Sequence, residues 1–391
     1  MESVYRHLDM GPPGAVLPAG PFLGATLTDG VLDLICAAGS VQLPFEWLRD
    51  NCLCDRCRIV QTDERRLTPW TWTDAPQATA CRVADGELIV DWADEHRTTF
   101  TADDWDRIRR AARRGAHTVT LWKAGYELGR FEYDEVLADS ASHLAMFEAF
   151  RRDGAVVVTD APQVPGTVVD FARSIGLTLI DSSLGFLFDV VVDPAGYNIA
   201  FTNEGLPPHN DNAQYLRPPG CQILSMVVNE ASGGETIVVD GWSVAEQLRD
   251  ADPAAIEVLS RVEVGFRQYS TTADGFGRSP LVVTDPHGRF SHLRFSNQLM
   301  QPLPFDHPRL AEWYRAYRAL GRAITDPANQ VHFRLQSGEM LFVNGYRMLH
   351  ARTAFVTDGP RHLQDVYFNI DDVHSVIAML TGEATNAMVH V

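Results

Sequence analysis

Residues 206–215, LPPHNDNAQY, place an imidazole and a carboxylate two positions apart, at His209 and Asp211. Side chains at positions i and i+2 of a β-strand share one face, so this pair can hold one metal ion if the segment is a strand. The pattern therefore predicts a strand that ends in a metal site. Alone it is weak, because His-x-Asp also occurs by chance and in purely structural roles.

A third ligand is expected from a distant part of the chain. His350 ends the strand-like segment EMLFVNGYRMLH (residues 339–350) and is the candidate. Two histidines and one carboxylate on one face of an octahedron leave three positions open, which is the arrangement used by non-haem Fe(II) oxygenases. Together with His209 and Asp211, His350 predicts an Fe(II) site.

Two further residues suit an organic acid bound beside such an iron. Arg361 follows His350 along the chain and offers a planar guanidinium fork, which matches the distal carboxylate of 2-oxoglutarate. Thr236, in the segment GGET, offers a hydroxyl group to the same carboxylate. The alternative for Arg361 is a surface ion pair, which becomes the weaker explanation once the iron ligands are considered with it.

Around these residues the chain shows many short strands and few helices. Strands are predicted at AVVVTDAP, YNIAFTN, CQILSMVV, GETIVVDG, VHFRLQ, EMLFVNG and QDVYFNID. Helices are predicted at SASHLAMFEAFRRDG, VPGTVVDFARSIG, SVAEQLRDADPAAIEVLSRV and HPRLAEWYRAYRALGRAI. This composition predicts a mainly β fold with helices (α+β), built as a double-sheet jelly roll rather than from βαβ units.

The first third of the chain has its own pattern. The segments DGVLDLIC and GELIVDWAD alternate apolar and polar residues and predict short strands. A long helical period first appears at ADDWDRIRRAARR. We expect a small β-rich N-terminal domain over residues 1–130 and a jelly-roll domain over residues 131–391.

Composition narrows the class of partner. The formal net charge of −18 and the pI of about 5.1 argue against nucleic acid or an anionic membrane as the main partner. No segment approaches the roughly 18 apolar residues of a membrane span, and the N-terminal residues lack a secretory pattern. A reducing cytoplasm is the expected location, where clustered cysteines bind metal more often than they form disulfides.

Four segments, NIAFTNEGLPPHND, GGETIVVDG, LHARTAF and RHLQDVYFNID, resemble the Fe(II)/2-oxoglutarate oxygenases of the taurine dioxygenase superfamily, specifically the γ-butyrobetaine hydroxylase branch. The resemblance covers nearly the whole chain from about residue 30. It implies a double-stranded β-helix catalytic domain that uses Fe(II), 2-oxoglutarate and O2, and releases succinate and CO2 while it hydroxylates an unactivated C–H bond. It also implies a homodimer, for which the sequence itself shows no self-pairing pattern.

Three of the 6 cysteines fall within RDNCLCDRC (residues 49–57), as Cys52, Cys54 and Cys57. His96, in VDWADEHRTTF, offers a fourth ligand. Three thiolates and one imidazole in tetrahedral array suit Zn(II), and a site with four protein ligands has no open position for catalysis. The resemblance supports this structural zinc, because that branch carries an N-terminal zinc module. A redox or free-thiol role is the alternative.

The substrate is less directly visible in the sequence. In the branch that the chain resembles, aromatic rings surround a trimethylammonium group by cation–π attraction, and asparagines bind the substrate carboxylate. Asn198 and Asn297 match those asparagines, with a turn or capping role as the alternative for each. The ring positions match Leu184, Phe188, Phe201 and Tyr367. Because one ring is missing and two are phenylalanines, a related zwitterionic amine, amino acid or phosphonate is also compatible with the resemblance.

Asp365 is a further candidate for substrate binding. If RHLQDVY is a regular strand, Arg361, Asp365 and Tyr367 share one face by the period of two. Asp365 is then expected to face the pocket, where it can pair with a primary amine or a guanidinium group. The alternative is a bulge that turns Asp365 to solvent or onto a neighbouring arginine.

The sequence therefore predicts a dioxygenase that hydroxylates a small zwitterionic amine or quaternary ammonium compound. Desaturation or cyclisation by the same cofactor chemistry is one alternative. A protein or peptide hydroxylase and a non-catalytic, zinc-stapled binding protein are two others.

Overall fold

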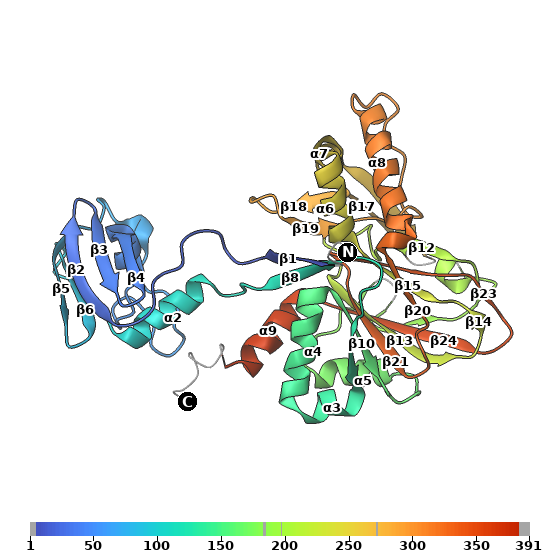
Figure 1. Cartoon of the computed structure of the whole chain (residues 1–391), viewed down its shortest axis with the longest axis horizontal. Helices are drawn as coiled ribbons and strands as arrows, with labels where there is room; N and C mark the ends of the chain where they lie inside the picture. The colour runs from blue at the N-terminus through green and yellow to red at the C-terminus, as the bar shows by residue number, and fades with distance from the viewer. Residues whose placement is uncertain (1–4, 183–184, 197, 271–272, 383–391) are drawn as a thin grey trace. The chain divides into compact units, whose positions relative to one another are not determined.

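The computed structural model describes residues 5–182, 185–196, 198–270 and 273–382, which form two compact units (Figure 1). The smaller unit holds Asp9–His117. The larger unit holds Thr118–Thr381 together with the first residues of the chain, up to Leu8. Residues 118–130, which the sequence placed with the N-terminal domain, thus pack with the larger unit.

The smaller unit is an insertion in the chain of the larger one. Strand β1 (Tyr5–Asp9) pairs with β8 (Thr118–Trp122), so the chain leaves and re-enters a single two-stranded sheet. The two crossing points are neighbours, because the backbone N–H of Met10 donates to the carbonyl of His117 at 2.8 Å.

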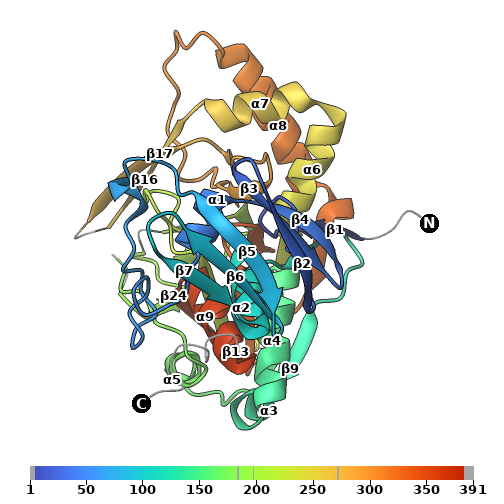
Figure 2. The same ribbon diagram turned by 90° about the vertical axis from the view of Figure 1, so that its left-hand side faces the viewer.

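Within its described residues, the smaller unit forms two three-stranded antiparallel sheets around one apolar core (Figure 2). The elements are β2 (Phe22–Thr28), β3 (Val31–Cys36), β4 (Gly39–Pro44), α1 (Phe45–Asp50), the 3₁₀ turn η1 (Pro69–Thr71), β5 (Ala78–Ala84), β6 (Glu87–Trp92), β7 (Arg97–Phe100) and α2 (Ala102–Ala112). Leu32 and Leu34 of β3 are fully buried and alternate with more exposed residues, as the pattern predicted. Trp105 of α2 packs edge-on against Phe22 and Phe100.

In the larger unit, two sheets face each other. The described six-stranded sheet has the order β11 (Phe188–Val190), β24 (Arg361–Phe368), β13 (Cys221–Asn229), β21 (Glu339–Asn344), β10 (Ala155–Thr159) and β9 (Gly129–Glu132). The described four-stranded sheet has the order β12 (Leu206–His209), β22 (Met348–Arg352), β15 (Thr236–Asp240) and β20 (Gln330–Phe333). Leu224, Leu341 and Leu363 of the first sheet and Val238 and Met348 of the second share one core. The predicted double-sheet jelly roll is confirmed.

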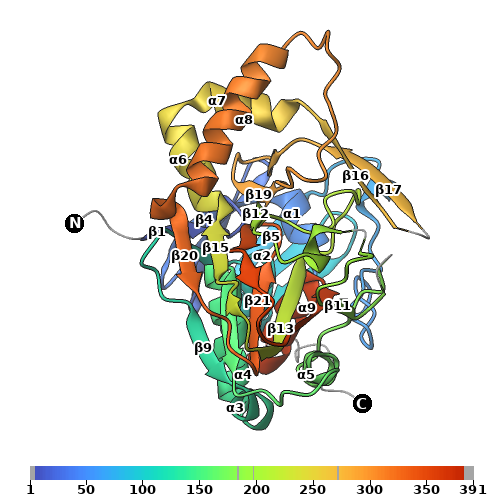
Figure 3. The ribbon, with the colours of Figure 1, turned by 90° about the vertical axis from the view of Figure 1, so that its right-hand side faces the viewer.

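Helices cover the outer face of the six-stranded sheet (Figures 1 and 3). They are α3 (Tyr133–Ala138), α4 (Ser140–Asp153), α5 (Thr167–Ser174) and α9 (Ile370–Leu380). Phe150 of α4 and Phe171 of α5 pack against Phe342 of β21, whose side chain points away from the inter-sheet core. The predicted helix over residues 140–154 ends at Gly154, which adopts φ 81°. None of the described helices is both long and apolar enough to cross a membrane.

A second group of helices and hairpins is inserted between β15 and β20. It comprises α6 (Gly241–Ala251), α7 (Pro253–Arg261), β16 (Val264–Tyr269), β17 (Asp274–Ser279), β18 (Val282–Thr284), β19 (Phe290–Leu293), α8 (Leu310–Thr325) and the 3₁₀ turn η3 (Pro327–Asn329). Two short strands, β14 (Ser232–Gly233) after β13 and β23 (Phe355–Val356) after β22, form a separate antiparallel pair. The prediction of one helix over residues 243–262 is wrong, because Asp252 ends α6 and caps α7, whose first residue is Pro253.

The predicted strand YNIAFTN is also wrong. Its described part forms a 3₁₀ turn, η2 (Ile199–Phe201). The side-chain Oδ1 of Asn198 accepts the backbone N–H of Ala200 at 2.9 Å, which satisfies that donor locally instead of in a sheet.

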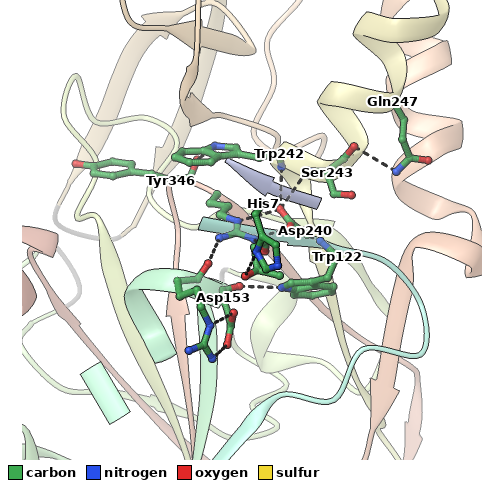
Figure 4. A network of polar contacts seen from close by, with 11 residues as sticks. His7, Trp122, Asp153, Asp240, Trp242, Ser243, Gln247 and Tyr346 are labelled. Carbon is green, nitrogen blue, oxygen red and sulfur yellow. Dashed lines mark hydrogen bonds and ion pairs between the residues drawn. The ribbon is translucent and has the colours of Figure 1, made fainter. Parts of the chain in front are cut away.

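A buried polar network ties β15 to β22 (Figure 4). Arg347, directly before β22, is 1% exposed, and its Nε and Nη2 donate to Asp240 at 3.1 and 2.6 Å. Arg347 also donates to the carbonyls of Arg152 and Thr120. Asp240 ends β15 and accepts in addition the backbone N–H of Trp122 at 3.0 Å. The network therefore fixes the ends of two strands that lead to the site described next.

Candidate active site

The two predicted histidine ligands lie opposite each other on paired strands. Strands β12 and β22 are antiparallel with His209 in register with His350, and their ring centroids are 4.3 Å apart. Asp211 follows the end of β12, with Oδ1 3.3 Å from Nε2 of His209 and Oδ2 3.6 Å from Nε2 of His350. All three donor atoms lie within 4.8 Å of one another. The arrangement fits a metal bound by two imidazoles and one carboxylate.

Hydrogen bonds orient these donors. Nδ1 of His209 lies 2.9 Å from the carbonyl of Pro207, a contact in which the ring N–H donates and Nε2 is left to face the cluster. Oδ2 of Asp211 accepts from Nε2 of Gln222 at 3.2 Å and from the hydroxyl of Tyr367 at 3.1 Å. Such second partners are typical of metal ligands, whose orientation they set.

The electrostatics favour the forms that bind metal. Burial would raise the pKa of Asp211, but the neighbouring His350 and His209 and the Tyr367 hydroxyl hold it well below its usual range. Burial, reinforced by His209, lowers the pKa of His350 to about 4. Near neutral pH the cluster thus contains an ionised carboxylate and a neutral His350 imidazole.

The cluster opens into a cavity between the two sheets. Predicted site residues that line it are His209, Asp211, His350, Thr236, Arg361, Phe188, Asn198, Asp365 and Tyr367. Much of the remaining wall is apolar, with Leu206, Leu224, Leu299, Leu335 and Leu363. A cavity with an apolar wall and a few convergent polar groups is typical of a small-molecule site.

Arg361 and Thr236 both reach this cavity. Arg361 begins β24, and its guanidinium lies 4.9 Å from the ring centroid of Phe355. Within the described residues, its Nε has no hydrogen-bond partner. Burial, together with the charge of Arg334, lowers the pKa of Arg361 to about 10, so it remains a cation. Thr236 begins β15 and is 7% exposed.

The sequence missed a second cavity-lining arginine, Arg352, although it lies within the quoted segment LHARTAF. Its guanidinium donates to the backbone carbonyls of Thr202, Ala200, Ile199 and Glu204. Arg352 therefore holds the η2 turn against β22, whereas the guanidinium of Arg361 is available to a ligand.

The residues matched to an aromatic cage are only partly brought together. Phe188 and Tyr367 line the cavity, and Phe201 packs edge-on against Phe188 with centroids 5.4 Å apart. Leu184 lies outside the described residues. The Tyr367 hydroxyl is already engaged with Asp211.

The two asparagines differ in placement. Asn198 lines the cavity, but its Oδ1 caps η2. Asn297 is exposed, and its Oδ1 accepts from the hydroxyl of Tyr317 on α8 at 2.6 Å. The structure does not bring Asn297 to the cavity wall, where its neighbours Ser296 and Gln298 lie instead. Substrate binding by Asn297 stays a prediction from resemblance.

Among the polar cavity residues that were not foreseen, Asn212 and Ser296 are almost fully buried. Asn212 is 3% exposed and adopts φ 55°, and Ser296 is 2% exposed. Among the described residues, neither Nδ2 of Asn212 nor Oγ of Ser296 has a hydrogen-bond partner. Asn212 follows Asp211 and Ser296 precedes Asn297 in the sequence. Proximity to these predicted residues was the signal that could have identified them as cavity residues.

The three cysteines and His96 assemble in the smaller unit. The Sγ atoms of Cys52, Cys54 and Cys57 lie 3.3, 3.7 and 3.7 Å from Nε2 of His96. All four donor atoms lie within 4.8 Å of one another. A Cys₃His set of this kind suits a tetrahedral zinc ion.

The surroundings of this cluster also fit a cation. Burial raises the pKa of the Cys52 thiol to about 12, so its thiolate persists only with a compensating positive charge. Burial also lowers the pKa of His96, which favours the neutral imidazole that binds metal. Arg49, 6% exposed, donates to Sγ of Cys57 at 3.2 Å and to Asp94 at 3.1 Å. These contacts orient the ligands from outside the cluster.

A profile of the taurine catabolism dioxygenase TauD, TfdA family matches residues 116–367. The chain belongs to this family. A second profile, described as gamma-butyrobetaine hydroxylase-like, N-terminal, matches residues 29–106, the region of the Cys₃His cluster. The expected family and enzyme class, a dioxygenase, are confirmed by these matches.

Relatives of the family align over most of the chain. The γ-butyrobetaine dioxygenase of Pseudomonas sp. (strain AK-1) is 32% identical, with 86% of this chain and 90% of that protein covered. The mitochondrial trimethyllysine dioxygenase of Gallus gallus is 26% identical, with 90% and 87% covered. Among solved structures, an asparagine oxygenase in complex with Fe(II), 2S,3S-3-hydroxyasparagine and succinate has a TM-score of 0.46 at 17% identity, and 61% of this chain and 93% of that chain are covered.

Proposed function

We propose that the protein is an Fe(II)- and 2-oxoglutarate-dependent dioxygenase that hydroxylates an unactivated C–H bond of a small zwitterionic amine or quaternary ammonium compound. The observation that carries this proposal is the assembly of His209, Asp211 and His350 on the wall of a cavity that Arg361 and Thr236 also line. When bound, iron and 2-oxoglutarate would supply an oxidation by O2 that converts 2-oxoglutarate to succinate and CO2 and places one oxygen atom of O2 on the substrate.

The residues of the chain divide this work. His209, Asp211 and His350 hold the metal on one face and leave the cavity side open. Arg361 binds the distal carboxylate of 2-oxoglutarate through its planar fork, with the Thr236 hydroxyl as a second donor. Both lie at strand starts, so their positions are fixed by the sheets.

The cavity positions the substrate and excludes water. Its leucine-rich wall lowers the local dielectric constant and shields the reacting C–H bond from solvent. Phe188, Tyr367, Asn198 and Asp365 line the part that we assign to substrate. Relatives named for γ-butyrobetaine and trimethyllysine support an amine-containing substrate class.

The Cys₃His cluster holds a structural zinc ion in this proposal. Four protein ligands leave no open position, so the ion stabilises the fold of the smaller unit rather than taking part in the reaction.

We also propose a homodimer, which rests on the family resemblance, and a cytoplasmic location, because a reducing compartment keeps the clustered cysteines available to bind metal. Light scattering that gives a 43.4 kDa particle at micromolar concentration would exclude the dimer.

Succinate formation tests the proposed function. The Fe(II)-loaded protein is incubated with 2-oxoglutarate, O2 and a panel of amine-containing acids, and products are analysed by mass. His209→Ala should abolish turnover, whereas His332→Ala, on an exposed position of the same sheet, should not. Gain of one oxygen atom supports hydroxylation, and loss of two hydrogens indicates desaturation or cyclisation. Turnover by His209→Ala close to that of the unmodified protein refutes the iron site.

A further inference from the structure

Asp365 occupies the centre of the cavity-facing side of β24. Its neighbours in register are Phe188 on β11 and Leu224 on β13, and all three side chains line the cavity. Arg361, Leu363 and Asp365 lie at alternate positions of one strand and line the same cavity. The strand is regular here, so the bulge that would turn Asp365 to solvent is absent from this described segment.

The carboxyl group of Asp365 is buried and incompletely satisfied, and burial together with the nearby Asp211 raises its pKa. The residue is 3% exposed, and among the described residues its Oδ1 has no hydrogen-bond partner. A buried polar atom in this state costs free energy unless a partner arrives. Because the residue lines a cavity, that partner can be a ligand that enters beside it.

The charged groups around Asp365 leave a place for a cation. Arg352 is held by four backbone carbonyls, and Arg361 lies over Phe355 at the start of the strand. Asp211, the nearby acid, accepts from Tyr367, and His350 completes the metal cluster. Within the described wall, Asp365 is thus the acidic group left for substrate once a metal takes Asp211, and a cationic substrate group beside it would favour its ionised form.

The remaining wall suits an N–H donor better than a trimethylammonium group. Phe188 presents a ring that is already packed against Phe201, and the Tyr367 hydroxyl is bound to Asp211. A carboxylate gains a charge-assisted hydrogen bond from a cation with N–H bonds, whereas a trimethylammonium group has no hydrogen to donate. Asn212 lines the same wall, and its Nδ2, which has no partner in the part of the chain that the structure describes, is a donor for an anionic or carbonyl group elsewhere on the substrate.

We infer that the substrate bears a nitrogen cation with at least one N–H bond, such as a primary, secondary or tertiary amine or a guanidinium group, and that Asp365 receives this hydrogen bond. Asp365 is then a residue that determines specificity, and it selects against fully methylated nitrogen. The inference deepens the proposed function and rests on it, because it takes the cavity beside the metal cluster as the substrate site.

A graded series of N-methylated ligands tests the inference without relying on turnover. The full-length protein, loaded with Fe(II) and 2-oxoglutarate under anaerobic conditions, is titrated by calorimetry with 4-aminobutanoate, its mono-, di- and trimethylated forms, and 4-guanidinobutanoate. We expect the tightest N–H-bearing ligand to bind at least tenfold more tightly than the trimethylated one, about 1.4 kcal/mol. Asp365→Asn should remove this preference, since the amide has no charge and is a poorer acceptor.

Asp189→Asn is the matched control. Asp189 is the β11 residue beside Phe188, and it pairs with Gln364 on the outer face through a 2.8 Å hydrogen bond. Asp189→Asn makes the same chemical change at the residue next to Phe188, the register partner of Asp365, but outside the cavity wall. The preference for N–H-bearing ligands should therefore persist. Circular dichroism and the melting temperature show whether each variant folds. If Asp365→Asn does not fold, the ligand series on the unmodified protein still shows whether N–H-bearing ligands are preferred.

Three results overturn the inference: binding of the trimethylated ligand as tightly as any other, failure of every N–H-bearing ligand to bind, or an unchanged preference in folded Asp365→Asn. The proposed function is judged separately by succinate formation in air. Succinate without an N–H preference leaves the function and removes the inference. A preference lost in Asp365→Asn, without succinate from any ligand, leaves the binding assignment and removes the proposed reaction.

Discussion

Replacing Arg347 with Met should cost the larger unit several kcal/mol of stability. The change keeps a long apolar side chain but removes the guanidinium that joins Asp240 of β15 to the start of β22. Arg347 and Asp240 are each 1% exposed, so solvent cannot replace the lost partner.

The magnitude follows from the partners that remain. Removal of one member of a buried ion pair typically costs about 3–5 kcal/mol, because the other charge is left buried without compensation. Asp240 still accepts backbone N–H groups of Trp122, Trp242 and Ser243, at 3.0 to 3.2 Å. We therefore expect a loss of unfolding free energy at the lower end of this range, about 3 kcal/mol. This holds even though the carbonyls of Thr120 and Arg152 also lose a donor.

The assay is urea unfolding of the full-length chain. The transition of the larger unit is identified as the one that moves to higher urea when Mn(II) and 2-oxoglutarate are added, because ligands of the folded form stabilise it. Arg267→Met is the control, since Arg267 pairs with Asp274 on an exposed hairpin and such surface pairs contribute little.

The double variant Arg347→Met/Asp240→Asn refines the test. Each single change leaves a buried group without its partner, so the double change should cost less than the sum of the two. A loss below about 1 kcal/mol for Arg347→Met, a comparable loss for Arg267→Met, or strict additivity would refute the reasoning from the buried pair.

Three other perturbations have definite expected outcomes. Cys54→Ala should remove zinc, as measured by elemental analysis, and lower the melting temperature of the smaller unit, whereas Cys81→Ala should retain the metal; full zinc content in Cys54→Ala would contradict the site. Arg361→Lys should raise the KM for 2-oxoglutarate roughly tenfold or more and change kcat less, because one hydrogen bond of a charged pair is worth about 1.5–3 kcal/mol. Gly154→Ala should lower the free energy of unfolding by more than about 1 kcal/mol, since the residue has φ 81° and a Cβ would lie 2.6 Å from the side chain of Met348; unchanged urea unfolding would contradict this.

Strand β24 shows what a sequence pattern predicts well. It is hydrogen-bonded to β11 on one side and β13 on the other, so the period of two is maintained and Asp365 faces the cavity as expected. The register that brings His209 opposite His350 could not be obtained this way, because nothing local specifies which distant strands pair. His350 was predicted as a ligand from its place at the end of a strand-like segment, and the strand that it pairs with was not predicted.

The wrong or incomplete predictions have local causes. The alternation in YNIAFTN imitates a strand, yet the side chain of Asn198 bonds to the backbone of Ala200 and stabilises a turn. In SVAEQLRDADPAAIEVLSRV, Asp252 before a proline ends one helix and caps the next. Asn297 accepts a hydrogen bond from Tyr317 of α8, and the sequence could not predict where that helix lies. Its neighbour Ser296 lines the cavity instead.

The insertion of the smaller unit between β1 and β8 has a consequence for engineering. The backbone hydrogen bond between Met10 and His117 holds the two ends of the smaller unit next to each other. After a single proteolytic cut within it, each fragment still carries one strand of the β1–β8 pair. Domains with adjacent ends tolerate excision and transplantation well. A short turn in place of residues 10–117 would therefore give a metal-binding jelly roll freed of its zinc cassette, and the cassette could be grafted into an exposed loop of another protein.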